Sequence, residues 1–275
     1  NTNTETGSKI IEEVNNSTTL THLSLQVISG IAEKDINKLN TLSENNKEQI
    51  DKLAEVAVKN ANNDKEDTDL IAKVVSVVSD EVVNNIMEEV SKSSIEENQT
   101  LSAKVLKAIV ESDSGKIDII NEDIKDTMIK QTIESAQNQQ DGIGIQESED
   151  MTSIVSDIIV NTNTETGSKI IEELNNSSTE NNLSLKVISG ISEKDTTKLN
   201  TLSENNKEQI EILTETAIKN ADASEENAEL IAQVVAVVSD ELVNKVVEEV
   251  NKSSIDEKES FSTQVLKSIV QKDPE

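Results

Sequence analysis

The chain has 275 residues, of which 25 are basic and 54 acidic, so its formal net charge at pH 7 is −29. Nucleic-acid backbones and anionic lipid surfaces repel so acidic a protein, which excludes nucleic-acid binding from the expected functions. Hydrophobic residues make up only 34% of the chain, Phe261 is the one Phe, Tyr or Trp, and cysteine is absent; this composition favours a thin aliphatic core without disulfides or thiolate metal sites.

An internal repeat dominates the sequence. Residues 1–115 align with residues 161–275 without a gap, and 75 of these 115 positions are identical. The stretch Thr41–Ile50 recurs without change as Thr201–Ile210. Self-similarity at a fixed period is typical of proteins built from repeated structural units. Because the chain starts inside a repeat, we expect it to be a fragment of a longer protein whose targeting signals lie outside it.

A weaker repeat divides the 160-residue period into two modules of about 80 residues. Its clearest mark is the pattern Val-Ser-Asp-x-x-Val-Asn, which appears at 78–84, 155–161 and 238–244. The predicted domains are a partial helical module at 1–70, helical modules at 71–150 and 151–230, and a partial helical module at 231–275.

Apolar residues recur at helical spacing along these modules. In the first partial module, one helix is predicted from Leu39 to Ala57, and the acidic residues 61–69 are expected to separate it from the next module. The equivalent acidic residues 221–229 are expected to act in the same way. A helix over about 70–92 follows. Its apolar face consists of Ile71, Val74, Val75, Val78, Val82 and Ile86.

A loop is predicted next, at Ser93-Ser94. The spacing from Glu88 to Leu101 is 13 residues, whereas the equivalent spacing from Glu172 to Leu183 is 11. Two residues cannot be removed from a straight helix without rotating its apolar face by about 200°. The helix must therefore be interrupted between these positions.

The second and third helices of the module follow this loop. The second carries Leu101, Val105, Leu106 and Ile109, and a capping box that starts at Ser94 precedes it. The third carries Ile117, Ile120, Ile124 and Met128. Its start is expected to be capped by Asp113 and Gly115, and by Asp195 in the following module. The glycine-rich residues 141–144 are expected to separate modules.

Three helices per module predict an all-α fold of tandem helical modules in an elongated array. The alternative is a long continuous coiled coil, because several apolar residues also fit a heptad frame. These residues are Ile11, Val14, Leu25, Ile28, Leu39 and Leu42. The heptad frame also places Thr18, Thr21 and Asp35 in the seam, so we favour the modules.

No residue is predicted to be catalytic, to bind a cofactor or to hold a metal ion. His22 is the only histidine, and because its position in the second copy is Asn182, it is interpreted as a loop residue. Adjacent glutamates could act as an acid–base pair only in a pocket that separates their pKa values. Side chains of neighbouring helical residues point about 100° apart, so these pairs are interpreted as solvated helix faces. They are Glu12-Glu13, Glu88-Glu89, Glu172-Glu173 and Glu248-Glu249.

Two further patterns are interpreted without assigning a specific binding site to them. Residues 62–69 carry oxygen ligands at alternate positions but lack the turn glycine and closing glutamate of an EF-hand loop, which favours diffuse cation screening. Acceptor sites for N-glycosylation arise by chance in a chain rich in Asn, Ser and Thr, although several fall in predicted loops. They are Asn15, Asn16, Asn98, Asn175, Asn176, Asn182 and Asn251.

These observations predict a non-catalytic structural spacer or scaffold segment of a larger fibrous or surface protein, with an extracellular or cell-surface location. Its partners are expected to be copies of itself or another protein, contacted through helical faces. Membrane insertion is not expected, since no apolar run reaches the ~18–20 residues of a membrane span. A small-molecule substrate is not expected either. The alternative is a multivalent protein-binding helical repeat, as in an adhesin, with Thr41–Ile50 as its contact surface.

Overall fold

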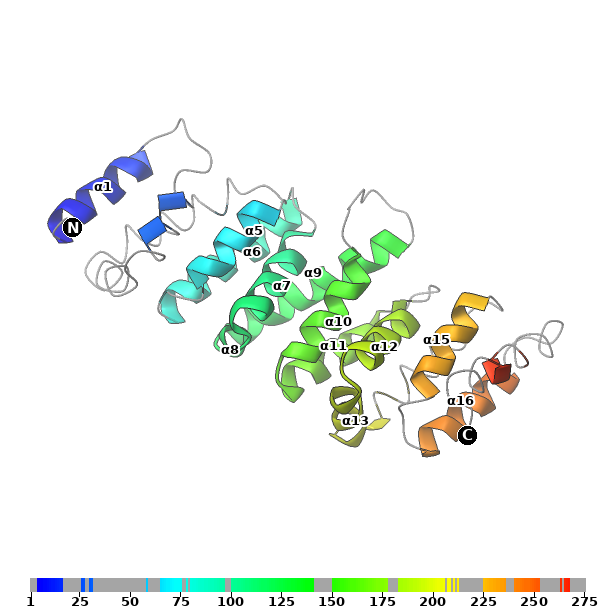
Figure 1. The fold of residues 1–275 in the computed structure, drawn as a ribbon. Coiled ribbons are helices and arrows are strands. Elements are labelled where there is room, and N and C mark those ends of the chain that lie inside the picture. Colours follow the sequence, from blue (N-terminus) through cyan, green and yellow to red (C-terminus); the bar gives the residue numbers. More distant parts are fainter. Residues whose placement is uncertain are drawn as a thin grey trace. The chain divides into compact units, whose positions relative to one another are not determined.

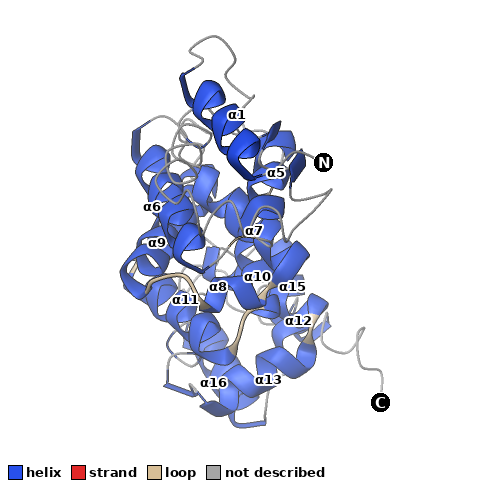
Figure 2. Ribbon diagram, turned by 90° about the vertical axis from the view of Figure 1, so that its left-hand side faces the viewer, coloured by secondary structure: helices blue, strands red, loops and turns tan. Residues whose placement is uncertain are grey.

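In a computed structural model of the chain, the described residues form α-helices joined by turns, and no strand occurs among them (Figures 1 and 2). The chain divides into two compact units, residues 1–132 and residues 133–275. The structure describes residues 4–16, 26–27, 30–31, 58, 65–75, 78, 80–96, 100–140, 150–177, 183–205, 207–208, 210, 212, 225–235, 240–252, 263 and 265–267.

In the first unit, three helices pack against the central helix α7 (Leu101–Asp113). They are α5 (Lys65–Val75), α6 (Asp80–Glu96) and the short α8 (Gly115–Asp118). The unit also contains α1 (Thr4–Asn16) and the first part of α9 (Glu122–Gln140).

Helix α9 is attached to its neighbours through Gln131. The Gln131 side-chain amide donates a hydrogen bond of 2.8 Å to the carbonyl oxygen of Ser91 in α6. The Ser102 hydroxyl of α7 donates to the Gln131 carbonyl oxygen at 2.6 Å. One glutamine therefore connects α9 to both α6 and α7.

In the second unit, α12 (Leu183–Lys194) packs against α10 (Met151–Asn161), α13 (Thr196–Asn205) and α15 (Glu225–Val235). Helix α11 (Thr164–Asn176) packs against α10 and α13, and α16 (Asp240–Lys252) packs against α15.

Side-chain caps mark where two of these helices begin. The Asp150 carboxylate accepts a hydrogen bond of 3.0 Å from the backbone N–H of Thr152 at the start of α10. The Asn163 side chain accepts one of 2.8 Å from the N–H of Thr166 at the start of α11. Such caps satisfy donors that have no partner within the helix.

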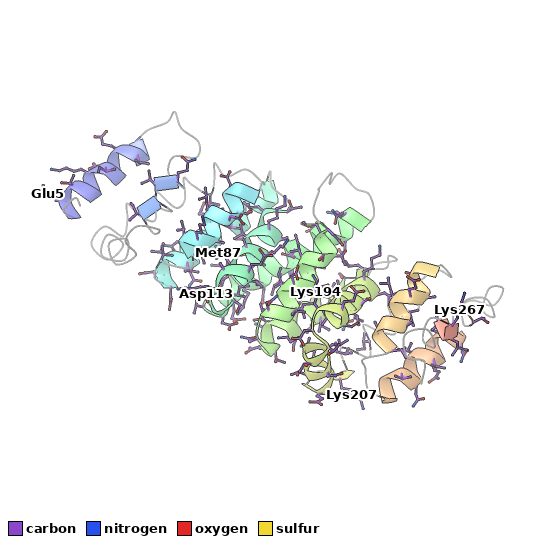
Figure 3. The ribbon with its side chains drawn as sticks, in the orientation of Figure 1. Glu5, Met87, Asp113, Lys194, Lys207 and Lys267 are labelled. Atoms are coloured by element: carbon purple, nitrogen blue, oxygen red, sulfur yellow. The ribbon has the colours of Figure 1, made fainter. Side chains whose placement is uncertain are left out.

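The predicted aliphatic core is confirmed. All six residues of the apolar face at 71–86 are buried, and so are the four predicted apolar positions of α7. Ile117, Ile120 and Met128 are buried as well, whereas Ile124 is half-buried. Met87, which Figure 3 labels, is completely buried beside this face. Helical periodicity therefore identified the core positions without any aromatic residue to anchor them.

The prediction of one helix over 70–92 is wrong. Helix α5 ends at Val75 and α6 begins at Asp80, although the N–H of Val78 still bonds the carbonyl of Val74 at 3.1 Å. Acidic residues interact favourably with the positive end of the helix dipole, and Asp80 and Glu81 lie in the first turn of α6. Division of the segment lets both α5 and α6 pack against α7.

The predicted interruption between Glu88 and Leu101 is confirmed, because α6 ends at Glu96 and α7 begins at Leu101, but its predicted place at Ser93-Ser94 is wrong. Helix α6 extends eight residues beyond Glu88, whereas α11 extends only four beyond Glu172. A longer helix thus takes up the two extra residues that the sequence comparison assigned to a loop. The proposed capping box at Ser94 is wrong for the same reason, since Ser94 is helical.

The acidic segments 61–69 and 221–229 were predicted to separate modules, but part of each segment belongs to a helix. Helix α5 begins at Lys65 and α15 begins at Glu225, so the second half of each segment is helical. Asp67 is buried and so is Asn227, at equivalent positions of the 160-residue repeat. These residues form the first turns of core helices, where acidic side chains favour helix initiation.

The motif Val-Ser-Asp-x-x-Val-Asn does not mark equivalent places in the two modules. At 78–84 it crosses from the end of α5 into α6, whereas at 155–161 it lies inside α10. Both asparagine amides donate at 2.9 Å to the carbonyl four residues earlier, Asn84 to Asp80 and Asn161 to Asp157, but Asn84 also accepts a bond from the N–H of Asn121, between α8 and α9. A shared motif of seven residues therefore serves two different local structures.

The predicted caps of the third helix differ between the modules. Asp195 is confirmed as a cap, because its carboxylate accepts from the N–H of Lys198 at 2.9 Å at the start of α13. In the other module Ser114 occupies the cap position of α8 without a side-chain bond, and Gly115 is the first helical residue. The third helix is there divided into α8 and α9.

The all-α prediction is confirmed for the described residues, and their helices pack against one another. The helices end and restart within a few residues, as between α5 and α6, between α10 and α11, and between α12 and α13. One continuous coiled coil does not accommodate these interruptions.

Candidate functional site

The described residues contain no group of three or more His, Asp or Glu side chains placed to hold a metal ion. Within the same ranges, no helix is long and apolar enough to cross a membrane. His22, the stretch Thr41–Ile50 and residues 62–64 lie outside the described residues, as do the glycine-rich residues 141–144.

The pair Glu88-Glu89 is an ion-pairing site on the surface of α6. The ammonium group of Lys92 lies 2.9 Å from a carboxylate oxygen of each glutamate. Hydrogen bonds, first to Glu88 and then to Glu89, raise the pKa of Lys92 above its usual value. More than half of the Lys92 side chain is exposed, so solvent screens the interaction. The two carboxylates share a cation, which is a surface helix arrangement rather than an acid–base pair.

In the other glutamate pairs, the described side chains are exposed or half-buried. Glu12, Glu13 and Glu172 are exposed, and Glu173 is half-buried. Glu248 is exposed near the end of α16.

Two lysines join helices through backbone carbonyls, and they occupy the same place in a pattern Asp-x-x-Lys that appears at 113–116 and at 195–198. The ammonium group of Lys116, at the start of α8, donates to the carbonyl oxygen of Val78 at 3.3 Å and lies 3.8 Å from Asp80. The ammonium group of Lys198, in α13, donates to the carbonyl oxygen of Thr162. Val78 lies between α5 and α6 and Thr162 between α10 and α11, where carbonyls have no partner within a helix. Lys116 therefore links α8 to the turn between α5 and α6, and Lys198 links α13 to the turn between α10 and α11.

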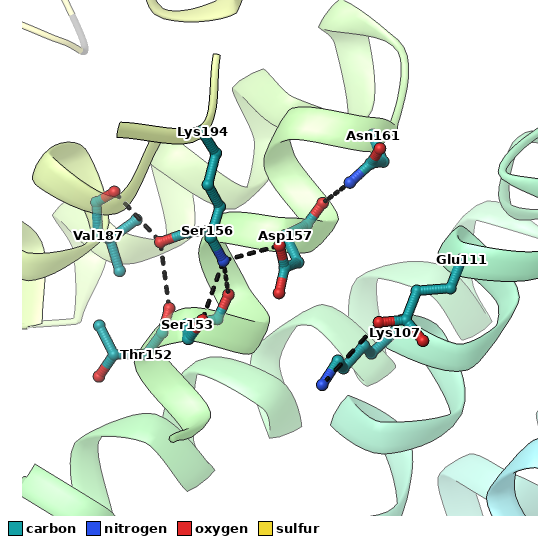
Figure 4. Close-up of polar contacts among 9 residues, drawn as sticks. All are labelled: Lys107, Glu111, Thr152, Ser153, Ser156, Asp157, Asn161, Val187 and Lys194. Atoms are coloured by element: carbon teal, nitrogen blue, oxygen red, sulfur yellow. Dashed lines mark hydrogen bonds and ion pairs between the residues drawn. The ribbon is translucent and has the colours of Figure 1, made fainter. Parts of the chain in front are cut away.

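A polar cluster joins α10 to the end of α12 (Figure 4). The ammonium group of Lys194 donates to the hydroxyl of Ser153 at 2.9 Å and to its carbonyl oxygen at 3.1 Å. The same group lies 2.7 Å from a carboxylate oxygen of Asp157, and both side chains are about one third exposed or less. All three donor positions of the ammonium are thus used in holding two helices together.

Helices α10 and α12 approach each other closely at Gly190. A Cβ atom at this position would lie 2.6 Å from the Ser156 hydroxyl oxygen, which is shorter than real contacts allow. Ser156 is completely buried, and its hydroxyl faces the carbonyls of Thr152 at 3.1 Å and Val187 at 3.2 Å. Only glycine permits the two helices to approach so closely here.

The second copy of the unchanged ten-residue stretch, Thr201–Ile210, has both buried and exposed positions. Leu202 and Ile210 are completely buried, which explains their identity in the two copies through packing. Glu204, Lys207 and Glu208 are exposed. Figure 3 labels Lys207 beyond the end of α13. Packing does not explain why these three charged residues are also identical in the first copy.

Two described glycosylation acceptors, Asn176 and Asn251, are exposed and lie in the last turns of α11 and α16 rather than in loops. The polar side chains that join the described helices are thus lysines, serines and amides, beside an aliphatic core. No protein-family model matches the chain, and no curated protein sequence matches it.

Proposed function

We propose that the chain is a non-catalytic structural spacer, a segment of a larger repetitive fibrous or surface protein that sets distance through tandem three-helix modules. The single observation that carries this proposal is the pair of equivalent fastenings made by Lys116 and Lys198. Lysines 82 positions apart in the sequence bond to the corresponding interhelix turn of their own modules. Serial copies of one structural unit would repeat such a hydrogen bond within each copy.

The packing of the second unit gives further support. Helix α12 packs against α10 and also against α15, which crosses the predicted boundary into the following module at residue 231. In solenoids each repeat contacts its neighbours, and an aliphatic seam continues from one repeat to the next. The excess of acidic side chains on the outer faces adds self-repulsion that opposes collapse of such a series into a ball.

Scattering in solution tests this proposal. The chain would be compared with a variant that carries one additional 160-residue period, which raises its length from 275 to 435 residues. An array that grows by addition of modules increases its radius of gyration by about 1.6-fold, whereas a globule, whose radius follows the 0.38 power of length, increases by only about 1.2-fold. A ratio near the globular value would overturn the spacer proposal.

One observation favours a second function, a multivalent protein-binding repeat. Glu204, Lys207 and Glu208 are exposed and yet identical to their counterparts in the first copy. Multivalency needs the same exposed surface in each copy. The two functions differ in what the parent assembly tolerates: a spacer responds to the number of periods and not to neutral substitutions at these three positions, and a binding repeat responds to the substitutions.

A further inference from the structure

Helices α1 and α11 have almost the same sequence and different surroundings. Thr4–Asn16 and Thr164–Asn176 are identical at 12 of 13 positions, and the one difference replaces Val14 with Leu174. Their intrinsic helical faces are therefore the same. Any difference in burial between them arises from neighbouring elements and not from the helix sequence.

In α11, one face is covered. Thr166, Ile170 and Leu174 are spaced four residues apart and have exposed fractions of 2%, 3% and 1%. Residues at i, i+4 and i+8 lie on one side of a helix, so they form a continuous stripe.

Neighbouring helices approach this stripe closely at Gly167. A Cβ atom there would lie 3.6 Å from the Ile159 side chain of α10 and 3.4 Å from the Leu202 side chain of α13. The covering helices are thus α10 and α13.

In α1, the same stripe is partly exposed. Ile10 is 47% exposed, whereas its counterpart Ile170 is 3% exposed. Thr6 is exposed, and Gly7 and Val14 are half-buried. The exposed Ile10 side chain leaves apolar surface in contact with water in the middle of the stripe. A partner helix that covered this surface would gain the free energy of burying it.

We propose that this stripe of α1 is a docking surface for a helix with the chemistry of α10. The inference rests on the proposed tandem array, and it names the partner of this surface. The occupant is a short aliphatic helix that presents branched residues equivalent to Ile158 and Ile159, which are buried in α10. Such a helix adds little repulsion to the acidic surface of α1, because the only charged residue of α10 is Asp157.

The connector between the two helices supports this choice of occupant. In the second copy, Thr162 and Asn163 form the turn between α10 and α11, and the Asn163 side chain caps α11. The same two residues precede α1 as Thr2 and Asn3. In front of α11, these two residues form the turn that lets the aliphatic helix α10 pack on the stripe. The same two residues stand in front of α1.

The absence of cysteine from the chain permits a direct test by thiol alkylation. Ile10→Cys and Ile170→Cys would be made separately in the full chain. Ile10→Cys is then made again in a chain with a second copy of residues 141–160 fused before Asn1. We expect Ile10→Cys to react rapidly in the unfused chain, and at least about tenfold more slowly in the fused chain, because a covered thiol reacts only through local opening.

A matched control keeps the fused length constant. In the fused copy alone, Ile158→Asp and Ile159→Asp remove the apolar contact, and they are expected to restore rapid alkylation of Ile10→Cys. Hydrogen exchange of the α1 amides gives a second readout that does not depend on the cysteine. Equal protection by the fused segment and its charged variant, or no protection by either, would overturn the proposal.

Two further outcomes are distinguishable. If alkylation of Ile10→Cys in the unfused chain slows as protein concentration rises, a second copy of the chain covers the stripe, and the proposed occupant is wrong. If the fused helix protects Ile10→Cys while the scattering ratio stays globular, docking holds and the spacer function fails. If the fused helix fails to protect Ile10→Cys while the radius of gyration rises by about 1.6-fold, the docking proposal fails and the spacer function holds.

Discussion

Gly190→Ala tests the close approach of α10 and α12, and the repeat supplies its own control. Gly190 and Gly30 occupy the same position of the 160-residue period. An added Cβ atom at Gly190 would lie 2.6 Å from the Ser156 hydroxyl oxygen and 3.1 Å from the Ser156 Cβ, whereas at Gly30 it would meet nothing within 4 Å. The same substitution is therefore a steric clash at one site and free of contact at the other.

The magnitude follows from two opposing effects. Exchange of glycine for alanine inside a helix stabilises it by roughly 0.8–1 kcal/mol, and this gain applies at both sites. Overpacking of a buried contact costs about 1–3 kcal/mol, and this cost applies only at Gly190. Ser156 cannot turn aside freely, because its hydroxyl bonds to backbone carbonyls in both helices. Gly190→Ala is therefore expected to be less stable than Gly30→Ala by about 1–3 kcal/mol.

Hydrogen exchange measured amide by amide is the suitable assay, since a chain of repeats need not unfold in a single step. Gly30→Ala lies in the other unit and leaves α10 and α12 unchanged, so the cost at Gly190 less the helix gain is what their amides report, about 2 kcal/mol at most. These amides are therefore expected to exchange up to about 40-fold faster in Gly190→Ala than in Gly30→Ala. Addition of Ser156→Ala to Gly190→Ala should recover much of the loss, because the shortest contact is to the hydroxyl. Equal exchange in the two single variants would refute the steric reasoning.

Three other predictions concern the first unit. Lys116→Met should destabilise it by about 1.5–3 kcal/mol, because the Val78 carbonyl loses a charged donor, and hydrogen exchange of α5 and α6 measures this; Lys198→Met in the second unit should act in the same way if the two fastenings are equivalent. Val78→Asp should unfold the packing of α5 on α7, since the side chain is buried and a charge there has no partner, and loss of helical circular dichroism with a wild-type-like second unit would confirm it. Glu88→Gln should lower the raised pKa of Lys92, as seen in a lysine side-chain NMR titration; because the folded pKa lies above the unfolded one, the interaction stabilises fully below the usual lysine pKa and is lost as the pH rises through the folded pKa.

The position of the core could be predicted from the sequence because helical spacing fixes which side chains share a face. Ile71, Val82 and Leu101 were assigned to apolar faces on this basis and are buried. The cap at Asp195 could be predicted too, since an aspartate before a helical pattern is a local signal.

The helix boundaries could not be predicted so well, because apolar periodicity continues across a turn when both helices pack against the same neighbour. Ile71 and Val82 fit one helical face, and yet they lie on α5 and α6 with an interruption between them. The acidic pair Asp80-Glu81 was the available signal for the second start. The hydrogen bonds of Lys116 and Lys198 could not be predicted, since a lysine that reaches a distant carbonyl looks in sequence like any surface lysine. Only the recurrence of Asp-x-x-Lys at 113–116 and 195–198 set these two lysines apart.

The sequence by itself determined the helical class, the repeat and the face of each helix that is apolar. Only the tertiary structure decided whether that face is covered. Ile10 and Ile170 stand in helices that differ at one position, and one is nearly half exposed while the other is buried. Local sequence sets the direction in which a side chain points, but burial depends on a second helix supplied from elsewhere.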